Sequence, residues 1–291
     1  MDKKRIAILM HEDAGLKPTE YLISILANYW QEDGHEIIYL WGTDQFVHAD
    51  LLFVHVDLSV VPNLYLQFAN QYPIVVNGKV RDIRKSKYSQ GLLHQGDNWE
   101  GSVIVKSNEN YAGRPERKRK RYNSIKDNIR HEIDRFVKRL NLSWIKPFFD
   151  TPLDYPIYDN LKEVPRPYFY HPQLVVQKFF PEKEDNLYCV RMMFFLGDHL
   201  NCIRLKGNHP IVNSMHILDV EPNIEPHPQI VSMRKRLKFD YGKFDYVVVD
   251  GQPILLDTNK TIGRPVKKLA SDSEMDSHLK HYANGLYSYF E

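Results

Sequence analysis

Apolar positions in the first third of the chain follow two different periods. Between residues 18 and 30, and again between 62 and 71, apolar side chains recur at helical spacing, and Thr19 lies near the start of the first helical segment. Short apolar runs bounded by polar or turn residues predict four buried strands, at residues 5–10, 36–40, 50–56 and 73–77. Strands that alternate with helices at such short intervals are typical of a parallel sheet.

This alternation predicts a Rossmann-like first domain. Dinucleotide-binding sheets of that kind carry a glycine-rich turn after the first strand, whereas this chain reads HEDAGLKP there instead of GxGxxG. We therefore expect the architecture of a nucleotide-binding domain without dinucleotide binding.

Residues 100–176 have a different composition. They begin with a predicted strand, EGSVIVKSNEN, and pass into a strongly basic stretch, RPERKRKRYNSIKDNIRHEIDRFVKRL, which is predicted to be helical. The prolines spread between residues 147 and 172 make long regular elements implausible in the segment that follows.

From Leu174 onward the pattern predicts antiparallel strands. LVVQKFF is followed by YCVRMMFFLGDHLNCIRLKG, which has a Gly-Asp turn near its centre. Two later apolar runs, residues 246–249 and 254–256, are joined by Asp250-Gly251 and predict a hairpin. A helix is predicted over residues 275–290. The expected fold class is therefore α/β, with an antiparallel second half that gives it α+β character.

The predicted hairpin gathers polar oxygen donors at one end. Asp245 precedes the first run, and Asp257 and Asn259 follow the second on the same side of a strand. A turn at Asp250-Gly251 would bring Asp245 alongside Asp257, and two carboxylates with an amide oxygen suit a Mg²⁺ ion that bridges nucleotide phosphates. The alternative is that these are caps or turn residues on a solvated edge, and composition alone favours it.

A set of basic residues lies in or beside apolar strand patterns. Long cationic side chains in such positions would suit a polyphosphate, although each one alone is better explained by a stem that packs at a strand edge while its charge reaches water. The set comprises Lys87, Lys106, Arg191, Arg204 and Lys206.

Composition excludes several classes of protein. A net charge of +2 argues against a dedicated nucleic-acid binder, and the 13 histidines include no HExxH spacing that would suggest a zinc hydrolase. The two cysteines, Cys189 and Cys202, lie in apolar runs and predict buried free thiols rather than a disulfide framework. Residues 6–10 are too short for a signal-peptide core, and no apolar stretch is long enough to span a membrane, so the expected location is the cytoplasm.

Four stretches, taken in order, resemble the motifs of one known family. They are VVNGKVRDIRKSK, SVIVKSNENYAGRPE, LVVQKFFPEKEDNLYCVRMMFFLGD and GKFDYVVVDGQPILLDTNKTIG. Together with the opening IAILMHED and the later GHEI, they resemble ATP-grasp enzymes of the D-alanine–D-alanine ligase and bacterial glutathione synthetase type. The resemblance covers nearly the whole chain except residues 114–172. It implies a Rossmann-like domain over 1–95, a lid subdomain over 96–176 and a core subdomain over 177–291.

The resemblance also implies roles for individual residues. Asn110 to Gly113 resembles the lid loop that closes on the phosphates, and Arg191, Lys243 and Arg204 are the implied catalytic residues, of which Arg191 and Lys243 would meet negative charge at the acyl phosphate. Asp245, Asp257 and Asn259 would be the metal ligands. The implied nucleotide contacts are Lys87 and Lys106 for the phosphates, Gln177, Lys178 and Phe179 for adenine, and Glu182 or Glu184 for the ribose.

Two positions depart from the family pattern. Asp257 stands where the family usually has Glu, so the carboxylate reaches about one methylene less far. Lys243 stands where the ligases usually have Arg, which replaces a bidentate fork by a point charge. Both departures bear on whether the full ligase reaction is retained.

The resemblance implies an ATP-dependent carboxylate–amine ligase that works through an acyl phosphate, with ATP and Mg²⁺, or Mn²⁺ in its place, as cofactors. The substrates would be a small-molecule or peptide carboxylate and an amine, neither of which the sequence identifies. An ATP-grasp kinase and a non-catalytic ATP-binding scaffold are the alternatives. The basic run Arg114 to Arg121 is either a solvated helix face or an electropositive mouth for an acidic substrate. A homodimer through the first domain is expected by family analogy, with neither nucleic acid nor membrane as partner.

Overall fold

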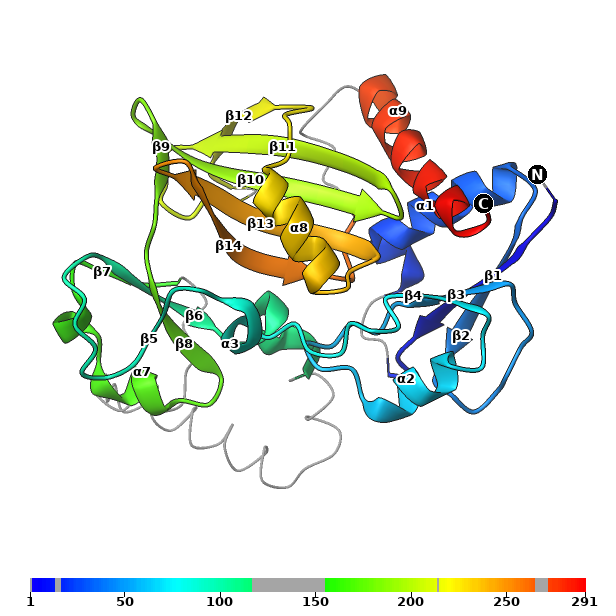
Figure 1. Ribbon diagram of the computed structural model, residues 1–291, viewed down its shortest axis with the longest axis horizontal. Coiled ribbons are helices and arrows are strands. Elements are labelled where there is room, and N and C mark those ends of the chain that lie inside the picture. The colour runs from blue at the N-terminus through cyan, green and yellow to red at the C-terminus, as the bar shows by residue number, and fades with distance from the viewer. Residues whose placement is uncertain (1, 14–16, 117–154, 214, 265–271) are drawn as a thin grey trace. The chain divides into compact units, whose positions relative to one another are not determined.

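A computed structural model describes residues 2–13, 17–116, 155–213, 215–264 and 272–291 (Figure 1). The chain forms two compact units. Unit 1 combines Met1–Asp82 with Glu182–Glu291, and unit 2 is the intervening segment Ile83–Pro181. Unit 2 is therefore an insertion into unit 1.

The first part of unit 1 is the parallel sheet that the sequence predicts. Its strands run in the order β2-β1-β3-β4, and every adjacent pair is parallel. Between the strands lie a short 3₁₀ turn, η1, and two helices, α1 and α2. The bounds are β1 Arg5–Met10, η1 Pro18–Glu20, α1 Leu22–Glu32, β2 Glu36–Trp41, β3 Leu51–Val54, α2 Asn63–Ala69 and β4 Ile74–Val76.

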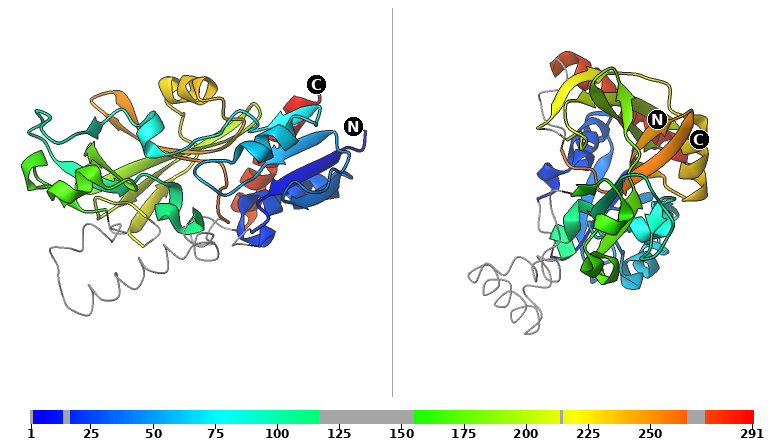
Figure 2. Two further views of the ribbon diagram at one scale, coloured as in Figure 1. Left: turned by 90° about the horizontal axis from the view of Figure 1, so that it is seen from below. Right: turned by 90° about the vertical axis from the view of Figure 1, so that its left-hand side faces the viewer.

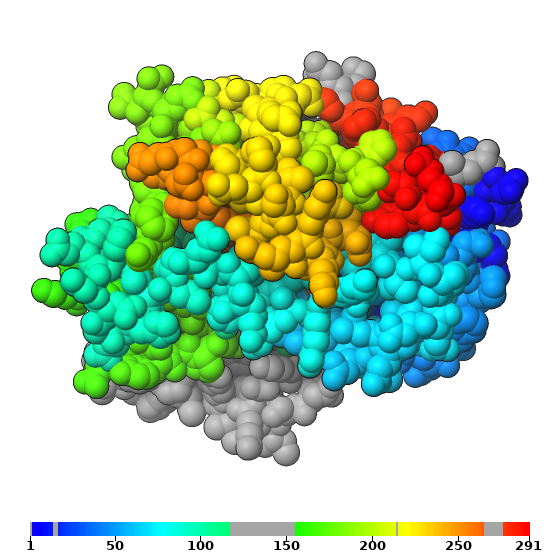
Figure 3. All heavy atoms as spheres, viewed as in Figure 1, coloured from blue at the N-terminus to red at the C-terminus, as the bar shows by residue number. Residues whose placement is uncertain are grey.

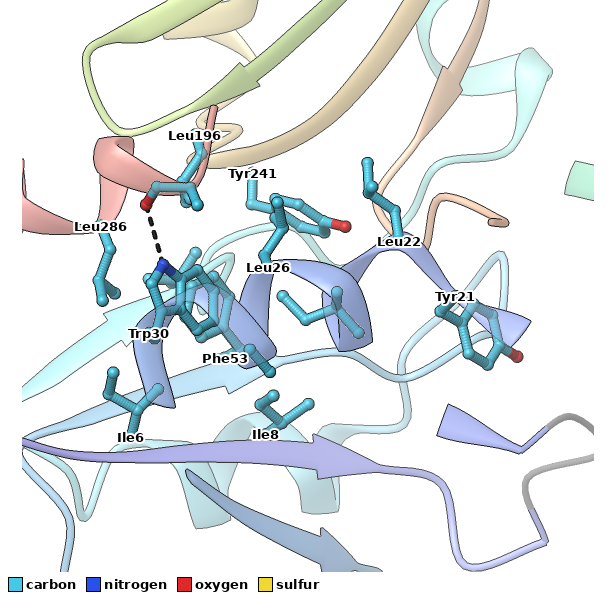
Figure 4. Packing of buried hydrophobic residues seen from close by; sticks show 14 of the residues in the cluster. Ile6, Ile8, Tyr21, Leu22, Leu26, Trp30, Phe53, Leu196, Tyr241 and Leu286 are labelled. Carbon is cyan, nitrogen blue, oxygen red and sulfur yellow. Dashed lines mark hydrogen bonds between the residues drawn. The ribbon is translucent and has the colours of Figure 1, made fainter. Parts of the chain in front are cut away.

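The strands of this sheet are apolar at consecutive positions, so apolar side chains point to both of its faces. Both faces are therefore covered by other elements. On one face, Ile6 and Ile8 pack with the residues of α1, and Trp30 stacks on Phe53 with ring centroids 5.2 Å apart (Figure 4). On the other face, Leu9 and its neighbours pack against α2. The indole Nε1 of Trp30 donates a hydrogen bond of 2.9 Å to a backbone carbonyl oxygen near the end of the chain, that of Ala283.

The second part of unit 1 is an antiparallel sheet. Its main path is β12-β11-β10-β13-β14, and β9 pairs with β10. Asp250 and Gly251 both have positive φ, as a two-residue turn in a tight hairpin requires, so the predicted Asp-Gly hairpin is confirmed. The bounds are β9 Glu182–Glu184, β10 Leu187–Leu196, β11 His199–Gly207, β12 Ile217–Glu221, β13 Tyr241–Val249 and β14 Gln252–Asn259.

Elements of the second part complete the core of the first part. The helix α8 spans Pro228–Arg236, α9 spans Asp272–Ala283, and the 3₁₀ segment η4 spans Asn284–Tyr289. Residues of α9 and η4 belong to the same apolar cluster as α1, and the red C-terminal helix lies beside the blue N-terminal elements in Figures 1 and 2. The helix predicted over 275–290 therefore ends at Ala283 and continues as a 3₁₀ segment.

Two further contacts join the parts of unit 1. Asn77, directly after β4, adopts a positive φ of 61° and is 1% exposed. Its side-chain oxygen accepts hydrogen bonds from the backbone N–H groups of Asp240 and Tyr241, and its amide nitrogen donates to the Tyr241 carbonyl oxygen at 2.8 Å. In addition, Lys4 Nζ lies 5.4 Å from the centre of the Phe290 ring. Blue atoms of the N-terminal part and red atoms of the C-terminal part adjoin in Figure 3.

Unit 2 contains a small antiparallel sheet in the order β5-β8-β6-β7. One face packs on an apolar cluster that includes Val103, Val105 and Val176. Of the basic run Arg114 to Arg121, residues 117–121 lie outside the described residues. The bounds are α3 Lys85–Tyr88, β5 Leu92–Leu93, β6 Val103–Ser107, η2 Asn110–Gly113, β7 Ile157–Tyr158, η3 Leu161–Glu163, α7 Arg166–Tyr170 and β8 Leu174–Lys178.

Within the described ranges, no helix combines the length and the apolar character that crossing a membrane would require.

Candidate functional site

Four polar side chains share one face of the antiparallel sheet of unit 1. Asp245 lies directly opposite Asp257, and Lys243 lies directly opposite Asn259. Residues directly opposite in an antiparallel pair point to the same face, and so do residues two apart in one strand. All four side chains are partly exposed. We call this group the polar face; it comprises Lys243, Asp245, Asp257 and Asn259.

A β-bulge creates the polar face. Between the turn and Tyr246 the hairpin has regular register, with Tyr246 opposite Leu255. Continued without interruption, that register would set Asp245 opposite Leu256 and would turn Asp257 to the other face. Instead, Leu256 is the extra residue of the bulge, and Asp257 pairs with Asp245. The predicted proximity of Asp245 and Asp257 is confirmed, and it depends on one inserted residue.

Lys243 supplies the positive charge of the polar face. Its Nζ lies 2.9 Å from the Asp245 carboxylate and 3.8 Å from the sulfur of Met192. The Asp257 carboxylate accepts a hydrogen bond of 3.1 Å from the N–H of Thr258. The polar face therefore holds two carboxylates, one of which is neutralised by an ammonium group.

The donors of the polar face fit a hard divalent cation. Carboxylate and amide oxygens are the ligands that Mg²⁺ and Mn²⁺ take in proteins. Asp245 and Asp257 supply two carboxylates, and the side-chain oxygen of Asn259 supplies a third donor from the same face. A different group of possible metal ligands lies at residues 11–13, directly after β1. Its three ligand atoms lie within 4.8 Å of one another, and among the described residues it is the one such group of three His, Cys, Asp or Glu side chains.

Arg191 and Arg204 lie on the opposite face from the polar face. Arg191 pairs with Arg204 across β10 and β11 and with Tyr246 across β10 and β13, whereas its neighbour Met192 pairs with Asp245. The strand alternation therefore directs both guanidinium groups away from Lys243. Their role as catalytic residues stays a prediction that this placement does not favour.

The two arginines instead hold Glu182. Arg191 donates to both Glu182 oxygens, at 2.9–3.1 Å, and the Nε of Arg204 lies 3.0 Å from Oε1. The N–H of Val248 donates to Oε2 at 2.7 Å, and the Glu182 side chain is 6% exposed. This carboxylate is already occupied by several donors, so the expectation that it accepts from a ribose stays untested and has less support.

Glu184 belongs to the same network but is more accessible. It accepts from Lys206 at 2.7 Å and from Arg204, and its side chain is 41% exposed. The Lys206 ammonium and the Arg204 guanidinium lower the pKa of Glu184 below its ordinary value. Of the two residues predicted to meet the ribose, Glu184 is the one with a solvent-accessible carboxylate.

In unit 2, Lys106 and Gln177 lie on the same face of the small sheet. Lys106 pairs with Val175, and Ile104 pairs with Gln177, which sets both polar side chains opposite the face that carries the apolar cluster. The side-chain nitrogen of Gln177 donates to Ser89 Oγ at 2.6 Å. The sheet therefore brings these two predicted nucleotide contacts together.

Lys178 and Phe179 use their backbone donors within unit 2. The N–H of Lys178 donates to the Gly91 carbonyl oxygen at 2.7 Å, and that of Phe179 donates to the Ser102 carbonyl oxygen at 2.9 Å. The Lys178 ammonium lies 4.2 Å from the centre of the Trp99 ring, on the face opposite Gln177. A contact of these residues with adenine would therefore use their carbonyl oxygens rather than these N–H groups.

The structure points to a lysine that the sequence reasoning missed. Lys87, the predicted phosphate contact, is exposed, whereas Lys85 is 2% exposed at the start of α3. Lys85 N donates to the Asn108 carbonyl oxygen at 2.9 Å, two residues beyond Lys106. The signal in the sequence is that Lys85 follows the apolar Ile83 by two positions, which predicts a buried stem.

Comparisons with known proteins identify the class of fold. No family model and no curated protein matches this chain. Among solved structures, an ATP-grasp RimK domain protein from Sphaerobacter thermophilus matches with 9% identity and a TM-score of 0.50, covering 99% of this chain and 100% of that one. The D-cycloserine synthetase DcsG matches with 11% identity and a TM-score of 0.54, covering 98% and 100%. A D-alanine–D-alanine ligase from Bacillus anthracis complexed with ATP matches with 11% identity and a TM-score of 0.47, covering 98% and 95%.

The first two matches, which span both chains almost completely, define the class of the protein: it has the ATP-grasp fold. The α/β architecture predicted from the sequence and the resemblance that its four motifs carried are thereby confirmed at the level of the fold.

Proposed function

We propose that this protein is an ATP-dependent ligase that joins a carboxylate to an amine. The observation that carries the proposal is the polar face of unit 1, which presents two carboxylates, an amide oxygen and a lysine together in a chain with the ATP-grasp fold. One of the proteins with the same fold is named as a synthetase, which also supports this reaction class.

In this proposal Asp245, Asp257 and Asn259 hold Mg²⁺. The ion, when bound, neutralises charge on the β- and γ-phosphates of ATP. Lys243 supplies a further positive charge next to the transferred phosphoryl group, because it already lies at 2.9 Å from Asp245. Arg191 and Arg204 hold Glu182 in place on the other face of the sheet, and their catalytic role stays a prediction.

In unit 2, taken by itself, nucleotide contacts are proposed as well. Lys106 meets the phosphates, with Lys87 or the buried Lys85 as the second lysine. The segment Gln177 to Phe179, which precedes the boundary between the units at Pro181, meets the adenine. Glu184, the accessible carboxylate after that boundary, is the better candidate for the ribose.

The proposed reaction has two steps. A carboxylate oxygen of the first substrate attacks the γ-phosphorus of ATP, which breaks the bond to the β-phosphate bridging oxygen and releases ADP. The amine of the second substrate then attacks the acyl carbon, an amide bond forms, and inorganic phosphate leaves as the amine loses a proton. The protein contributes positioning and charge stabilisation, which is the main demand of phosphoryl transfer.

Thermal unfolding with and without ligand tests the nucleotide site. ATP with Mg²⁺ at about 100 times its dissociation constant should stabilise the protein by about 2.7 kcal/mol, a shift of several degrees, and EDTA should reduce that shift. Asp257→Ala should reduce it as well. Asp219→Ala, at an exposed position on β12 of the same sheet, should not. A wild-type transition that nucleotide and metal leave unmoved contradicts the proposal.

ADP release tests the reaction class. A ligase releases ADP at an appreciable rate only when a carboxylate and an amine are both present, and inorganic phosphate appears with the amide. Release with a single hydroxyl or carboxylate acceptor, without amide, would identify a kinase instead.

A non-catalytic ATP-binding protein is the second candidate. The observation that favours it is the ion pair between Lys243 and Asp245, which occupies one of the two carboxylates of the polar face, together with the shorter reach of Asp257. This candidate predicts metal-dependent stabilisation by ATP without ADP release for any substrate pair.

A further inference from the structure

β14 is an edge strand of the antiparallel sheet in the described part of the chain. In the described order β12-β11-β10-β13-β14 it is the last strand, and its ladder partner is β13. The bulge at Leu256 interrupts that ladder directly before Asp257. The orientation of side chains beyond the bulge therefore depends on contacts made where the chain leaves the sheet.

The chain beyond Asn259 is anchored on the loop that follows β3. Lys260 is 0% exposed, and its Nζ donates to the carbonyl oxygens of Val56, at 2.7 Å, and Leu58, at 2.6 Å. Asp57 lies between these two carbonyl groups. The Lys260 ammonium thus holds the backbone on both sides of Asp57 against the end of β14.

Each oxygen of the Asp57 carboxylate accepts a hydrogen bond from a hydroxyl group. Oδ2 accepts from the hydroxyl of Tyr21 at 2.8 Å, and Oδ1 accepts from the hydroxyl of Thr261 at 2.8 Å. A hydroxyl group has one proton to donate. The Thr261 oxygen is 3.5 Å from Oδ1 of Asn259, so its proton goes to Asp57, and the carboxylate sets the position of Thr261.

Thr261 in turn orients Asn259. The backbone N–H of Thr261 donates to Asn259 Oδ1 at 2.8 Å. An amide oxygen has two lone pairs, so this bond leaves one for a second partner. Oδ1 is also the atom through which an asparagine binds a hard divalent cation. A continuous chain of hydrogen bonds therefore runs from Tyr21 through Asp57 and Thr261 to the candidate ligand atom.

We infer that Asp57 is a positioning residue for the metal: through the Thr261 hydroxyl, it holds the side-chain oxygen of Asn259 in the orientation that binds the divalent cation. This inference rests on the proposed function, since it requires Asn259 to be a metal ligand. Hydrogen-bond partners of metal ligands typically change metal affinity by roughly 10- to 100-fold when they are removed.

The test is a calorimetric titration of Mg²⁺ in the presence of the non-hydrolysable ATP analogue AMP-PNP. Thr261→Val removes the hydroxyl and keeps the shape, and we expect it to raise the Mg²⁺ dissociation constant about tenfold. Asp57→Asn should act in the same direction, because the amide group can accept at only one of the two positions. Thr261→Ser restores the hydroxyl and should stay within about threefold of the wild type.

Two controls separate positioning from general damage. Thr258→Val makes the same chemical change on the opposite face of β14, where Thr258 is 1% exposed, and should leave the Mg²⁺ affinity unchanged. AMP-PNP binding in EDTA should be the same for Thr261→Val and the wild type, which a merely misfolded variant would not show.

The outcomes distinguish this inference from the proposed function. If Asn259→Ala weakens Mg²⁺ binding but Thr261→Val binds Mg²⁺ like the wild type, the relay through Asp57 is wrong and the metal site stands. If AMP-PNP binds the wild type equally well with and without Mg²⁺, the metal site and the relay are both wrong.

Discussion

Protonation of His55 is predicted to destabilise the protein in mild acid. His55 follows β3 and is 1% exposed, with its ring between Tyr21, at 4.9 Å between ring centroids, and Tyr241, at 6.2 Å. Within the described part of the chain, neither ring nitrogen has a hydrogen-bond partner. The pKa of His55 is lowered from its ordinary 6.5 to about 4, mainly because the ring is buried; the Asp57 carboxylate opposes this shift, and the nearby Lys260 ammonium adds to it.

The sign and size of the effect follow from linkage between protonation and folding. Because the folded-state pKa of His55 lies below the value of 6.5 expected in the unfolded chain, the unfolded state takes up the proton first as the pH falls. The stability that the neutral ring contributes is present above pH 6.5 and is lost progressively toward pH 4. From these two pKa values, the loss amounts to about 2 kcal/mol at pH 5, and it approaches about 3 kcal/mol in stronger acid.

The assay is urea unfolding at pH 7.5 and pH 5.0. Other titrating groups contribute to the pH dependence of every variant, so only the difference between variants is interpreted. His55→Phe should lose about 2 kcal/mol less than the wild type over this interval. His48→Phe, at an exposed position, is the matched control and should lose as much as the wild type. Equal losses for His55→Phe and the wild type would refute the reasoning.

Two further substitutions test the packing of unit 1. Asn77→Ala should lower the free energy of unfolding in urea by about 2–3 kcal/mol, because it leaves the N–H groups of Asp240 and Tyr241 without their acceptor. The control Asn70→Ala, at an exposed position, should have little effect. Equal effects of the two substitutions would contradict the role of Asn77. Glu182→Gln should cost about 3 kcal/mol because two partly buried arginines lose the carboxylate that they share. Glu184→Gln, with a more exposed carboxylate, should cost clearly less than Glu182→Gln, and a reversed order would overturn this assignment.

The periodicity of the sequence predicted the fold well and the site less completely. Alternating apolar runs were enough for the parallel sheet and for the Asp250-Gly251 hairpin, because period and turn residues are local properties. The sequence predicts less well to which face of the sheet a side chain points, because a shift of the strand register by one residue reverses that face. The bulge at Leu256 turns the Asp257 side chain to the face that carries Asp245, and no residue type around Leu256 predicts that bulge.

The same sensitivity bears on site residues whose roles stay predictions. Arg191 is a cation within an apolar strand, but its neighbour Met192 is the residue of β10 that pairs with Asp245. Lys87 and Lys85 are two positions apart, and burial singles out Lys85. The contacts of Asp57 with Thr261 join residues 204 positions apart, so no local pattern could have indicated them.

The insertion of unit 2 into unit 1 has a consequence for the order in which the protein folds during synthesis. The apolar cluster under α1 includes Tyr282, Ala283 and Leu286, which leave the ribosome after the whole of unit 2. At about 5–20 residues per second, roughly ten to forty seconds of translation separate Asp82 from these residues. During that interval unit 2 can be completed while the part of the cluster that Tyr282, Ala283 and Leu286 later cover stays exposed. Because transiently exposed apolar surface favours aggregation, we expect the nascent chain to be most prone to aggregate at this stage.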